Sequence, residues 1–277
     1  NNASSERVIE WNGSRWNKTA DSLPQKAHGI RYGAGVSREI NVCGHHFVYS
    51  SLSGDGMHYW DNQDFNEQSL RLAAGYKNRS AVQSFGIVPF AEQNWLGGKR
   101  YNRETGIRTD FSRRLSEKWQ LSLNAGYIKK YYRNSDSAAR YNSHMPLAGA
   151  TLAYSAPKNW LLYGGADWSH DITKEAEQAS VRKGIRFGAA KAFENGFGIS
   201  TNLRYARRTF DAPGSLVYRL TRKDHEYQAN ASIWHNKIAW KGLVPHLNFR
   251  YLKIDSNMSG FYSRKNMQTF ISVEKQF

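Results

Sequence analysis

Residues 119–127 read WQLSLNAGY, and apolar side chains alternate along this stretch with polar or small ones. Successive side chains of a β-strand point to opposite faces, so the stretch would present one apolar and one polar face. A helix would instead repeat its apolar residues at three- and four-residue steps. The stretch therefore predicts a strand whose apolar face carries Trp119, Leu121, Leu123, Ala125 and Tyr127.

The same two-residue period recurs along most of the chain. It is clearest in residues 181–189, 197–205, 227–233 and 247–251, and least clear in residues 6–17. Extended through the sequence, the period predicts strands at residues 6–17, 27–38, 42–52, 66–77, 80–90, 101–112, 117–130, 144–155, 159–170, 180–191, 195–208, 223–234, 245–254 and 264–276. An even number of strands would place both ends of the chain on the same side of a membrane.

The composition combines low hydropathy with many aromatic residues. Hydrophobic residues make up 40% of the 277 residues and the mean hydropathy is −0.71, yet the chain contains 9 Trp, 16 Tyr and 13 Phe. A transmembrane barrel resolves this conflict, because its strands alternate lipid-facing apolar residues with inward polar ones and carry aromatic girdles. No run approaches the roughly 18 apolar residues of a membrane-spanning helix. We therefore predict an all-β fold, a closed transmembrane antiparallel β-barrel of about 14 strands, with residues 1–277 as a single domain.

The predicted connections alternate between long and short. The long ones lie near residues 52–65, 91–100, 131–143, 170–179, 209–222 and 255–263, and the short ones near 77–80, 112–117, 156–159 and 193–196. Outer-membrane barrels have short periplasmic turns and longer outer loops, whereas a soluble β-sandwich has no reason to sort its loops in this way. The exception is the connection near residues 235–244, which is long for a periplasmic turn.

The last residue of the chain is aromatic. Phe277 would share a face of the last predicted strand with Thr269, Ile271 and Val273, while Lys275 would reach towards the membrane interface. A terminal aromatic residue on a last alternating strand is typical of proteins inserted into the outer membrane. Phe277 is therefore the candidate C-terminal insertion signal.

The formal net charge is +16, from 39 Lys and Arg against 23 Asp and Glu. Such a charge can indicate a nucleic-acid-binding protein, but here the basic residues are scattered over alternate strand positions and loops. We expect no nucleic-acid partner, since a positive barrel interior and contacts with lipopolysaccharide and membrane lipids explain the charge better. The single cysteine, Cys43, permits no intrachain disulfide and is expected to be an inert thiol of the wall.

Several short strings, densest in the last third of the chain, point to one family. They are residues 97–101 (GGKRY), 106–108 (GIR), 207–214 (RRTFDAPG), 222–227 (RKDHEY), 233–236 (IWHN), 242–247 (GLVPHL) and 255–257 (DSN). With these strings the chain resembles, over most of its length, the barrel domain of the surface lipoprotein assembly modulator (Slam) family. Residues 261–266 (FYSRKN) depart from the aromatic and acidic pattern of that family, so the match is partial there.

The resemblance implies an integral protein of the Gram-negative outer membrane that helps lipoproteins cross that membrane to the cell surface. It implies a surface lipoprotein substrate, periplasmic chaperones and the barrel-assembly machinery as partners, with no cofactor and no enzymatic step. Family members usually carry a periplasmic tetratricopeptide-like domain before the barrel. The sequence starts at Asn1 without a starting methionine or a signal peptide, so we expect a mature or trimmed fragment that lacks that domain.

The alternation also predicts which charged residues point into the barrel interior, which we call the lumen. They are Arg31, Arg71, Arg108, Asp110, Asp167, Arg182, Arg186, Arg204, Arg250 and Glu274. These residues could form ion pairs that rigidify the barrel, or a polar path that passes or senses a polypeptide. Both interpretations require paired charges, since an unpaired charge at low dielectric is costly. Small inward residues would leave room for bulky neighbours, namely Gly33, Gly35, Gly184, Gly188 and Gly198.

The sequence offers no convincing catalytic or metal-binding set. His45 and His46 are adjacent, so in a strand they would point to opposite faces. Residues 97–99 lack the spacing of a phosphate-binding loop and are expected to form a turn. Two further groups are better explained as structural contacts, namely Asp224, His225 and Glu226 near a strand start, and Asp55, His58 and Asp61 in a loop.

Lipoprotein translocation is the leading functional hypothesis, and it rests on the resemblance. The alternative is a passive porin-like channel for small solutes, which should show an inward-folded loop and steady ion conductance. An outer-membrane enzyme is disfavoured because no site supports it. An adhesin is suggested only by Tyr59, Trp60 and Trp95 on predicted outer loops. If the barrel opens sideways, the seam between its first and last strands is the expected place.

Overall fold

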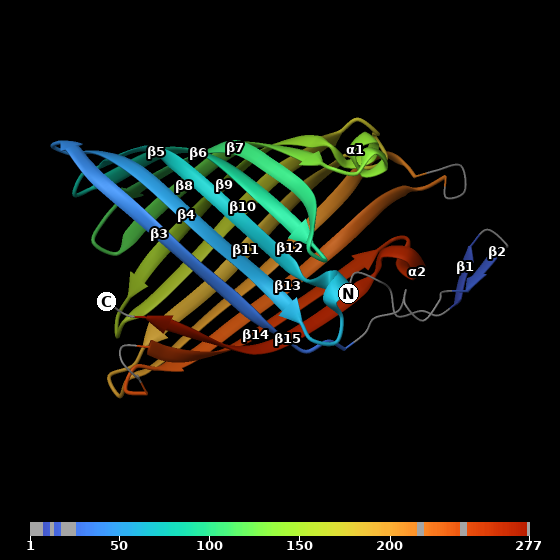
Figure 1. Cartoon of the computed structure of the whole chain (residues 1–277). Helices are drawn as coiled ribbons and strands as arrows, with labels where there is room; N and C mark the ends of the chain where they lie inside the picture. The colour runs from blue at the N-terminus through green and yellow to red at the C-terminus, as the bar shows by residue number, and fades with distance from the viewer. Residues whose placement is uncertain (1–7, 12–13, 18–25, 215–218, 239–242, 276–277) are drawn as a thin grey trace.

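The computed structural model describes residues 8–11, 14–17, 26–214, 219–238 and 243–275. Its main feature is a single antiparallel sheet of 13 strands, in which each strand pairs with its neighbours in sequence. The sheet curls round into a barrel-like cylinder of tilted strands (Figure 1). The strands are β3 (Gly29–Cys43), β4 (His46–Tyr59), β5 (Glu67–Arg79), β6 (Gln83–Leu96), β7 (Lys99–Arg114), β8 (Trp119–Tyr132), β9 (Ser143–Ala156), β10 (Trp160–Thr173), β11 (Ser180–Ala192), β12 (Phe197–Pro213), β13 (Thr221–His235), β14 (Leu243–Ser256) and β15 (Arg264–Lys275).

The alternation of the sequence produces two different faces of this sheet. Trp119, Leu123 and Tyr127 remain 42%, 41% and 39% exposed on one face of β8. The strand register continues this face sideways, because Leu123 lies between Phe111 of β7 and Ala150 of β9. We call this side the apolar face, and the opposite side the polar face.

Thirteen of the fourteen predicted strands are confirmed, and the first is wrong. Instead of one strand over residues 6–17, the chain forms a separate hairpin of β1 (Val8–Trp11) and β2 (Ser14–Asn17). The sequence between them is Asn12-Gly13, the dipeptide most typical of a two-residue hairpin turn, which explains why the segment folds on itself. Residues 6, 7, 12 and 13 themselves lie outside the described residues.

The edges of the large sheet are β3 and β15, and no ladder joins them within the described part of the chain. The closure predicted from the sequence is therefore not observed as hydrogen bonding. The curvature nevertheless brings the edges towards each other, since Arg31 of β3 and Arg250 of β14 lie within electrostatic range.

The two ends of the cylinder differ, as the loop lengths predicted. At one end lie short connections such as those between β3 and β4 and between β9 and β10. At the other lie η2 (Gln63–Phe65), α1 (Ser135–Tyr141) and α2 (Ser259–Tyr262), and the β1–β2 hairpin contacts α2 (Figure 1). We call these the short-turn end and the long-loop end. Strand β3 starts at the long-loop end and β15 finishes at the short-turn end.

One connection at the long-loop end differs from the prediction. Instead of a long loop over residues 91–100, β6 and β7 are joined by the tight turn Gly97-Gly98. Both glycines have positive φ, 55° and 74°, a conformation that glycine adopts at little cost and that two-residue hairpin turns require. The expected turn at residues 97–99 is thereby confirmed.

The polar face is not uniformly polar. Ala73, Phe90 and Ile128 are buried there as a small apolar cluster, against which Tyr49 and Met145 pack. This cluster fills the space between strands β4 to β9 near the long-loop half of the cylinder. Within the described residues, no helix has the length and apolar composition needed to cross a membrane.

Candidate functional site

The polar face is the candidate site, because it collects charged side chains from strands that are far apart in sequence. The register places nine of the ten predicted lumen residues on it, and the side chain of the tenth, Glu274, lies outside the described residues. The nine are Arg31, Arg71, Arg108, Asp110, Asp167, Arg182, Arg186, Arg204 and Arg250.

One set of ion pairs crosses β10 to β13. Arg204 Nε donates to Asp167 Oδ1 at 3.2 Å, and a second contact joins Arg204 Nη2 to Asp167 Oδ2. Arg182 pairs with Glu226 across β12 in the same way. Each pair connects two strands that are separated by one other strand. The side chains therefore lie along the wall and cross-link it across the strand direction.

A second set lies on β5 to β8. Arg71 is 3.6 Å from Glu92, and Lys130 is 3.9 Å from Glu104. The Phe90 ring lies beneath this set, with the Arg71 guanidinium 4.0 Å from its centroid. The guanidinium of Arg108 is 5.4 Å from the same centroid and completes the group. These contacts are partly exposed, so each is worth at most about 1 kcal/mol in stability.

Glycines make room for these side chains. A Cβ atom at Gly184 would lie 3.0 Å from both Arg204 Nη2 and Asp167 Oδ2, so the ion pair occupies the space that a side chain would fill. A Cβ at Gly188 would lie 2.1 Å from the Tyr163 ring, and one at Gly198 would lie 2.0 Å from the Trp234 ring. The prediction that small inward residues accommodate bulky neighbours is confirmed at these three positions.

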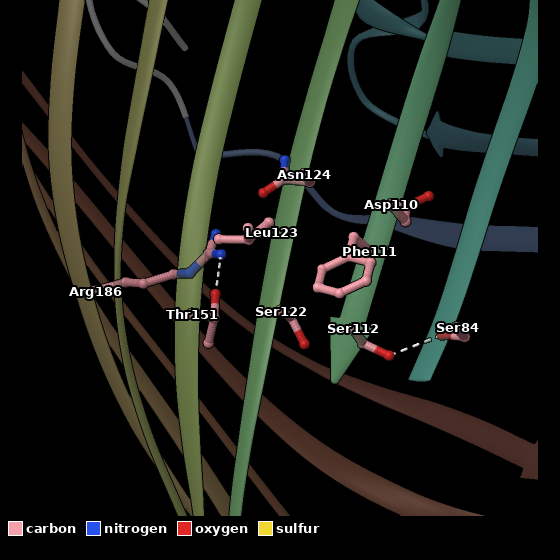
Figure 2. A pocket seen from close by; sticks show the side chains of 9 residues that line it. All are labelled: Ser84, Asp110, Phe111, Ser112, Ser122, Leu123, Asn124, Thr151 and Arg186. Atoms are coloured by element: carbon pink, nitrogen blue, oxygen red, sulfur yellow. Dashed lines mark hydrogen bonds between the residues drawn. The ribbon is translucent and has the colours of Figure 1, made fainter. Parts of the chain in front are cut away.

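A hollow opens on the wall in the short-turn half of β7 and β8. Its lining includes Asp110, Asn124 and Arg186, and Figure 2 shows the Arg186 side chain reaching Thr151. Arg186 Nη2 donates to Thr151 Oγ1 at 2.5 Å. The hollow brings together one carboxylate, one guanidinium and several hydroxyl and amide groups, which can hydrogen-bond a peptide backbone in either direction.

Arg31 and Arg250 are two of the predicted residues that lie near the edges of the sheet. They lie on strands β3 and β14, within electrostatic range of each other. The Arg250 guanidinium is 5.8 Å from the centroid of the Phe270 ring on β15. No ion pair of either arginine is found among the described residues. Two cations thus lie near the two open edges of the sheet.

The most buried charges of this face lie at the long-loop end. The sequence singled out Asp224 and Glu226 as structural contacts, but it did not assign them or their arginine partners to the lumen. Asp224 is 1% exposed and Glu226 is 7% exposed, on β13. Arg208, Arg222 and Arg264 surround them from β12, β13 and β15. The predicted strands 195–208, 223–234 and 264–276 already contain Arg208, Asp224, Glu226 and Arg264, and their alternation assigns these residues to the polar face. Arg222 lies one residue before the predicted strand.

The other candidate groups do not converge. His225 lies on the apolar face, where its Nδ1 is 2.7 Å from Tyr205 Oη, so it does not join Asp224 and Glu226. Asp55 accepts a hydrogen bond from Ser69 Oγ at 2.8 Å, whereas Asp61 binds the backbone N–H of His28. No group of three metal-ligating side chains occurs within the described ranges.

The remaining predictions concern single residues. His46 hydrogen-bonds the Tyr76 hydroxyl across β4 and β5 on the apolar face. Cys43 is free and exposed at the last position of β3. Phe277, the candidate insertion signal, lies outside the described residues.

A protein-family model described as "Surface lipoprotein assembly modifier" matches residues 1–277. The chain is 30% identical over 285 residues to "Surface lipoprotein assembly modifier 1" of Haemophilus influenzae, covering 100% of this chain and 57% of that protein. It is 28% identical to "Surface lipoprotein assembly modifier" of Pasteurella multocida, covering 94% of this chain and 54% of that protein. It is also 25% identical to "Hemophilin secretion modulator" of Acinetobacter baumannii, covering 91% of this chain and 50% of that protein. The chain thus spans little more than half the length of these relatives.

Proposed function

Because the chain belongs to the surface lipoprotein assembly modifier family, we propose that it is an outer-membrane barrel that helps deliver lipoproteins to the bacterial cell surface. The family match over the whole chain is the observation that carries this proposal. The names of the relatives refer to surface lipoprotein assembly and to secretion, in keeping with a passenger that is itself a protein. Periplasmic chaperones would bring the passenger, and the barrel-assembly machinery would insert the barrel.

The exposed apolar face supports membrane insertion. Apolar side chains such as Val36, Leu72 and Phe187 are 68%, 59% and 60% exposed, which is costly in water and favourable in lipid. In the membrane, the backbone groups of the edge strands β3 and β15 would be expensive to leave unpaired. The edges therefore pair with each other or with an additional strand, and the sheet is a closed barrel in its resting state.

The polar face then lines the lumen and provides the route. Its ion pairs and hydrogen-bonding groups hold a polypeptide by contacts that are individually weak and easily exchanged. A lipoprotein also carries acyl chains, which need an apolar route. We place the exit of these chains at the seam between β3 and β15, where the sheet ends and no ladder is observed within the described residues. The pairing that closes the resting barrel at this seam would have to open for the acyl chains to pass.

Reconstitution tests this function directly. The full-length relative of this barrel is placed in lipid vesicles, and a lipoprotein with its chaperone is presented on the side of the short-turn end. We expect the lipoprotein to become accessible to protease on the far side, but not in vesicles without the barrel. Equal accessibility with and without the barrel would contradict the proposal.

A passive channel is the second candidate, and one observation favours it. The loop that contains α2 folds inward at the long-loop end, where Met258 is 2% exposed and Tyr262 stacks on Arg222 at 3.7 Å. Porins carry an inward-folded constriction loop of this kind. Steady single-channel conductance in planar bilayers, together with no lipoprotein transfer, would favour the channel over the translocator.

A further inference from the structure

Four arginines gather on the polar face at the long-loop end, and we call them the arginine cluster. They come from four different elements of the sheet, namely Arg182 of β11, Arg208 of β12, Arg222 of β13 and Arg264 of β15. Arg182 lies directly opposite Arg208 in the register. Arg264 lies opposite Ile254, and Ile254 lies opposite Glu226, so Arg264 is in the same row of the sheet as Glu226. Within the described residues, the carboxylates that form ion pairs with these arginines are Asp224 and Glu226.

The two carboxylates are fully engaged. Arg222 holds both oxygens of Asp224, with Nε to Oδ1 at 3.0 Å and Nη2 to Oδ2 at 2.6 Å. The two oxygens of Glu226 face Arg182 and Arg208, and the distance from Arg208 Nε to Oε1 is 3.8 Å. Each carboxylate oxygen therefore already faces a guanidinium of Arg182, Arg208 or Arg222.

Three arginines of the cluster, Arg182, Arg208 and Arg264, have an Nε without a hydrogen-bond partner. Arg182 still binds Glu226 through Nη2, whereas Arg208 and Arg264 make no short ion pair among the described residues. Among the described residues, no ion pair or hydrogen bond of the Arg264 guanidinium is found, and its Nε is buried without a hydrogen-bond partner. Arg208 has only its long contact to Glu226, and its Nε also lacks a hydrogen-bond partner. A guanidinium presents five N–H donors in a planar fork, so these two side chains can still bind an anion in a bidentate way.

Arg222 is held in place by its contacts and borders the other arginines of the cluster. The Tyr262 ring lies on its guanidinium at 3.7 Å and the Phe210 ring at 4.6 Å, while Asp224 binds its edge. These contacts leave Arg222 little freedom to turn towards another partner. They also exclude water from one side of the cluster, which strengthens the attraction of the remaining arginines for an anion.

We propose that Arg208 and Arg264 form a binding site for the carboxylate side chains of an acidic polypeptide segment. The surplus of two guanidiniums over carboxylates in the cluster needs a negative partner, and the planar fork of arginine matches a carboxylate. The site faces the lumen rather than the lipid. A lipid phosphate would instead meet basic residues of the apolar face, such as Arg207 and Lys183, which lie opposite each other in the register.

That the peptide belongs to a passenger in transit rests on the proposed function. The binding site itself is inferred from the contacts of the arginine cluster. An acidic segment of the passenger would bind at the long-loop end and be held there while the rest of the chain follows. Binding of the acidic segment would favour movement of the passenger towards the long-loop end without nucleotide hydrolysis.

Binding of a defined probe tests the site without any transport. The purified full chain in detergent micelles is titrated into fluorescent hexaglutamate at an ionic strength of about 0.1 M, and the dissociation constant is measured by fluorescence anisotropy. Hexaglutamine serves as the uncharged probe. The variants are Arg208→Gln and Arg264→Gln, with Arg207→Gln and Lys265→Gln as matched controls that remove one positive charge from the opposite face of the same strands.

We expect hexaglutamate but not hexaglutamine to bind, and each cluster variant to weaken binding about tenfold, as the loss of a charge-assisted hydrogen bond does. The matched controls should change binding less than about twofold, because surface charges are screened over about 10 Å. Thermal unfolding of each variant confirms that it is folded. Equal weakening by the controls, or no binding of hexaglutamate by the unchanged chain, overturns the site.

Two further outcomes separate this inference from the proposed function. Binding of lipopolysaccharide headgroups in place of hexaglutamate, with the same dependence on Arg208 and Arg264, would overturn the peptide as occupant. Lipoprotein transfer in vesicles that is unchanged by Arg264→Gln, although hexaglutamate binding is lost, would overturn the role in transit and leave the translocator intact. Loss of hexaglutamate binding together with slower lipoprotein transfer supports both the binding site and its role in transit.

Discussion

Arg204 of β12 and Asp167 of β10 meet across the intervening strand β11, in the space directly over Gly184. The absence of a side chain at Gly184 is what allows this contact, since a Cβ there would lie 3.0 Å from Arg204 Nη2. We expect Gly184→Val to break the ion pair and to lower the free energy of unfolding by about 1–3 kcal/mol. The unfolding transition in detergent micelles measures this change.

A matched glycine provides the control for this prediction. Gly86 lies on the polar face of β6, and a Cβ there would lie 3.5 Å from the Lys77 Cγ, an ordinary contact distance. We expect Gly86→Ala to leave the unfolding transition almost unchanged. A destabilisation by Gly86→Ala as large as that by Gly184→Val would mean that a side chain at any such glycine is destabilising, whether or not it displaces an ion pair.

Tyr163 lies over Gly188, and its hydroxyl accepts a hydrogen bond from Asn202 Nδ2 at 3.0 Å. Gly188→Ala must displace the ring, so we expect it to destabilise the protein by about 1–3 kcal/mol. Tyr163→Phe removes only the hydrogen bond and should cost about 1 kcal/mol. The single variant Tyr163→Ala removes the ring altogether. The double variant Gly188→Ala with Tyr163→Ala should therefore be less destabilised than the sum of the effects of Gly188→Ala and Tyr163→Ala. Strict additivity of the two changes in unfolding free energy would contradict the contact between the ring and residue 188.

The contact between Asp61 and His28 should depend on pH. Both carboxylate oxygens of Asp61 lie 3.1 Å from the backbone N of His28, and this hydrogen bond is the main reason why the pKa of the Asp61 carboxyl is lowered. A lowered folded pKa means that the contact stabilises the start of β3 above the ordinary aspartate pKa and is lost as the pH falls through the lowered value.

Hydrogen exchange can measure this loss. After correction for intrinsic rates, the amides near His28 should lose protection below about pH 4, the region of the ordinary aspartate pKa. In Asp61→Asn the protection should be lower at neutral pH and no longer change in this range. A pH dependence that survives in Asp61→Asn would assign the effect to another group.

The proposed seam can be locked. In a Cys43→Ser background, which removes the native thiol, cysteine pairs are scanned along β3 against β15, and pairs that form a disulfide are kept. We expect such pairs to reduce surface display of the lipoprotein several-fold, with recovery on reduction. Cysteine pairs between β8 and β9, which are already joined by a ladder, are the control and should have no effect. Full display by a locked seam would remove the lateral exit.

The sequence predicted the strands because each one faces two different environments, and this leaves an alternating pattern that can be read locally. Strand ends were less predictable. Strand β4 continues to Tyr59 rather than residue 52, because residues such as Asp55 and Gly56 still pair with β5 although they interrupt the apolar series. The separate β1–β2 hairpin was missed because the prediction of residues 6–17 rested on alternation alone, which does not reveal the Asn12-Gly13 turn signal.

The partners of the inward charges could not be predicted from the sequence. Arg204 reaches Asp167, 37 residues away, because the register of three strands places Gly184 between them. Register is a property of the folded sheet, and no local pattern reveals it. The arginine cluster was missed for a related reason, since β12, β13 and β15 meet at the long-loop end beyond the clearest part of their alternation.

A lipoprotein that passes along the polar face of this barrel must contact the side chains of that face, and site-specific photo-crosslinking during transfer detects such contacts. A photoreactive amino acid is placed at Gln228 on the polar face, and in a second variant at its neighbour Ala229 on the apolar face. Asn124 and Leu123 of β8 form a second matched pair. We predict crosslinks to the lipoprotein from Gln228 and Asn124 while transfer is in progress, and none from their neighbours. Continued transfer with no crosslinks from the polar face, or with crosslinks only from the apolar face, would contradict the account.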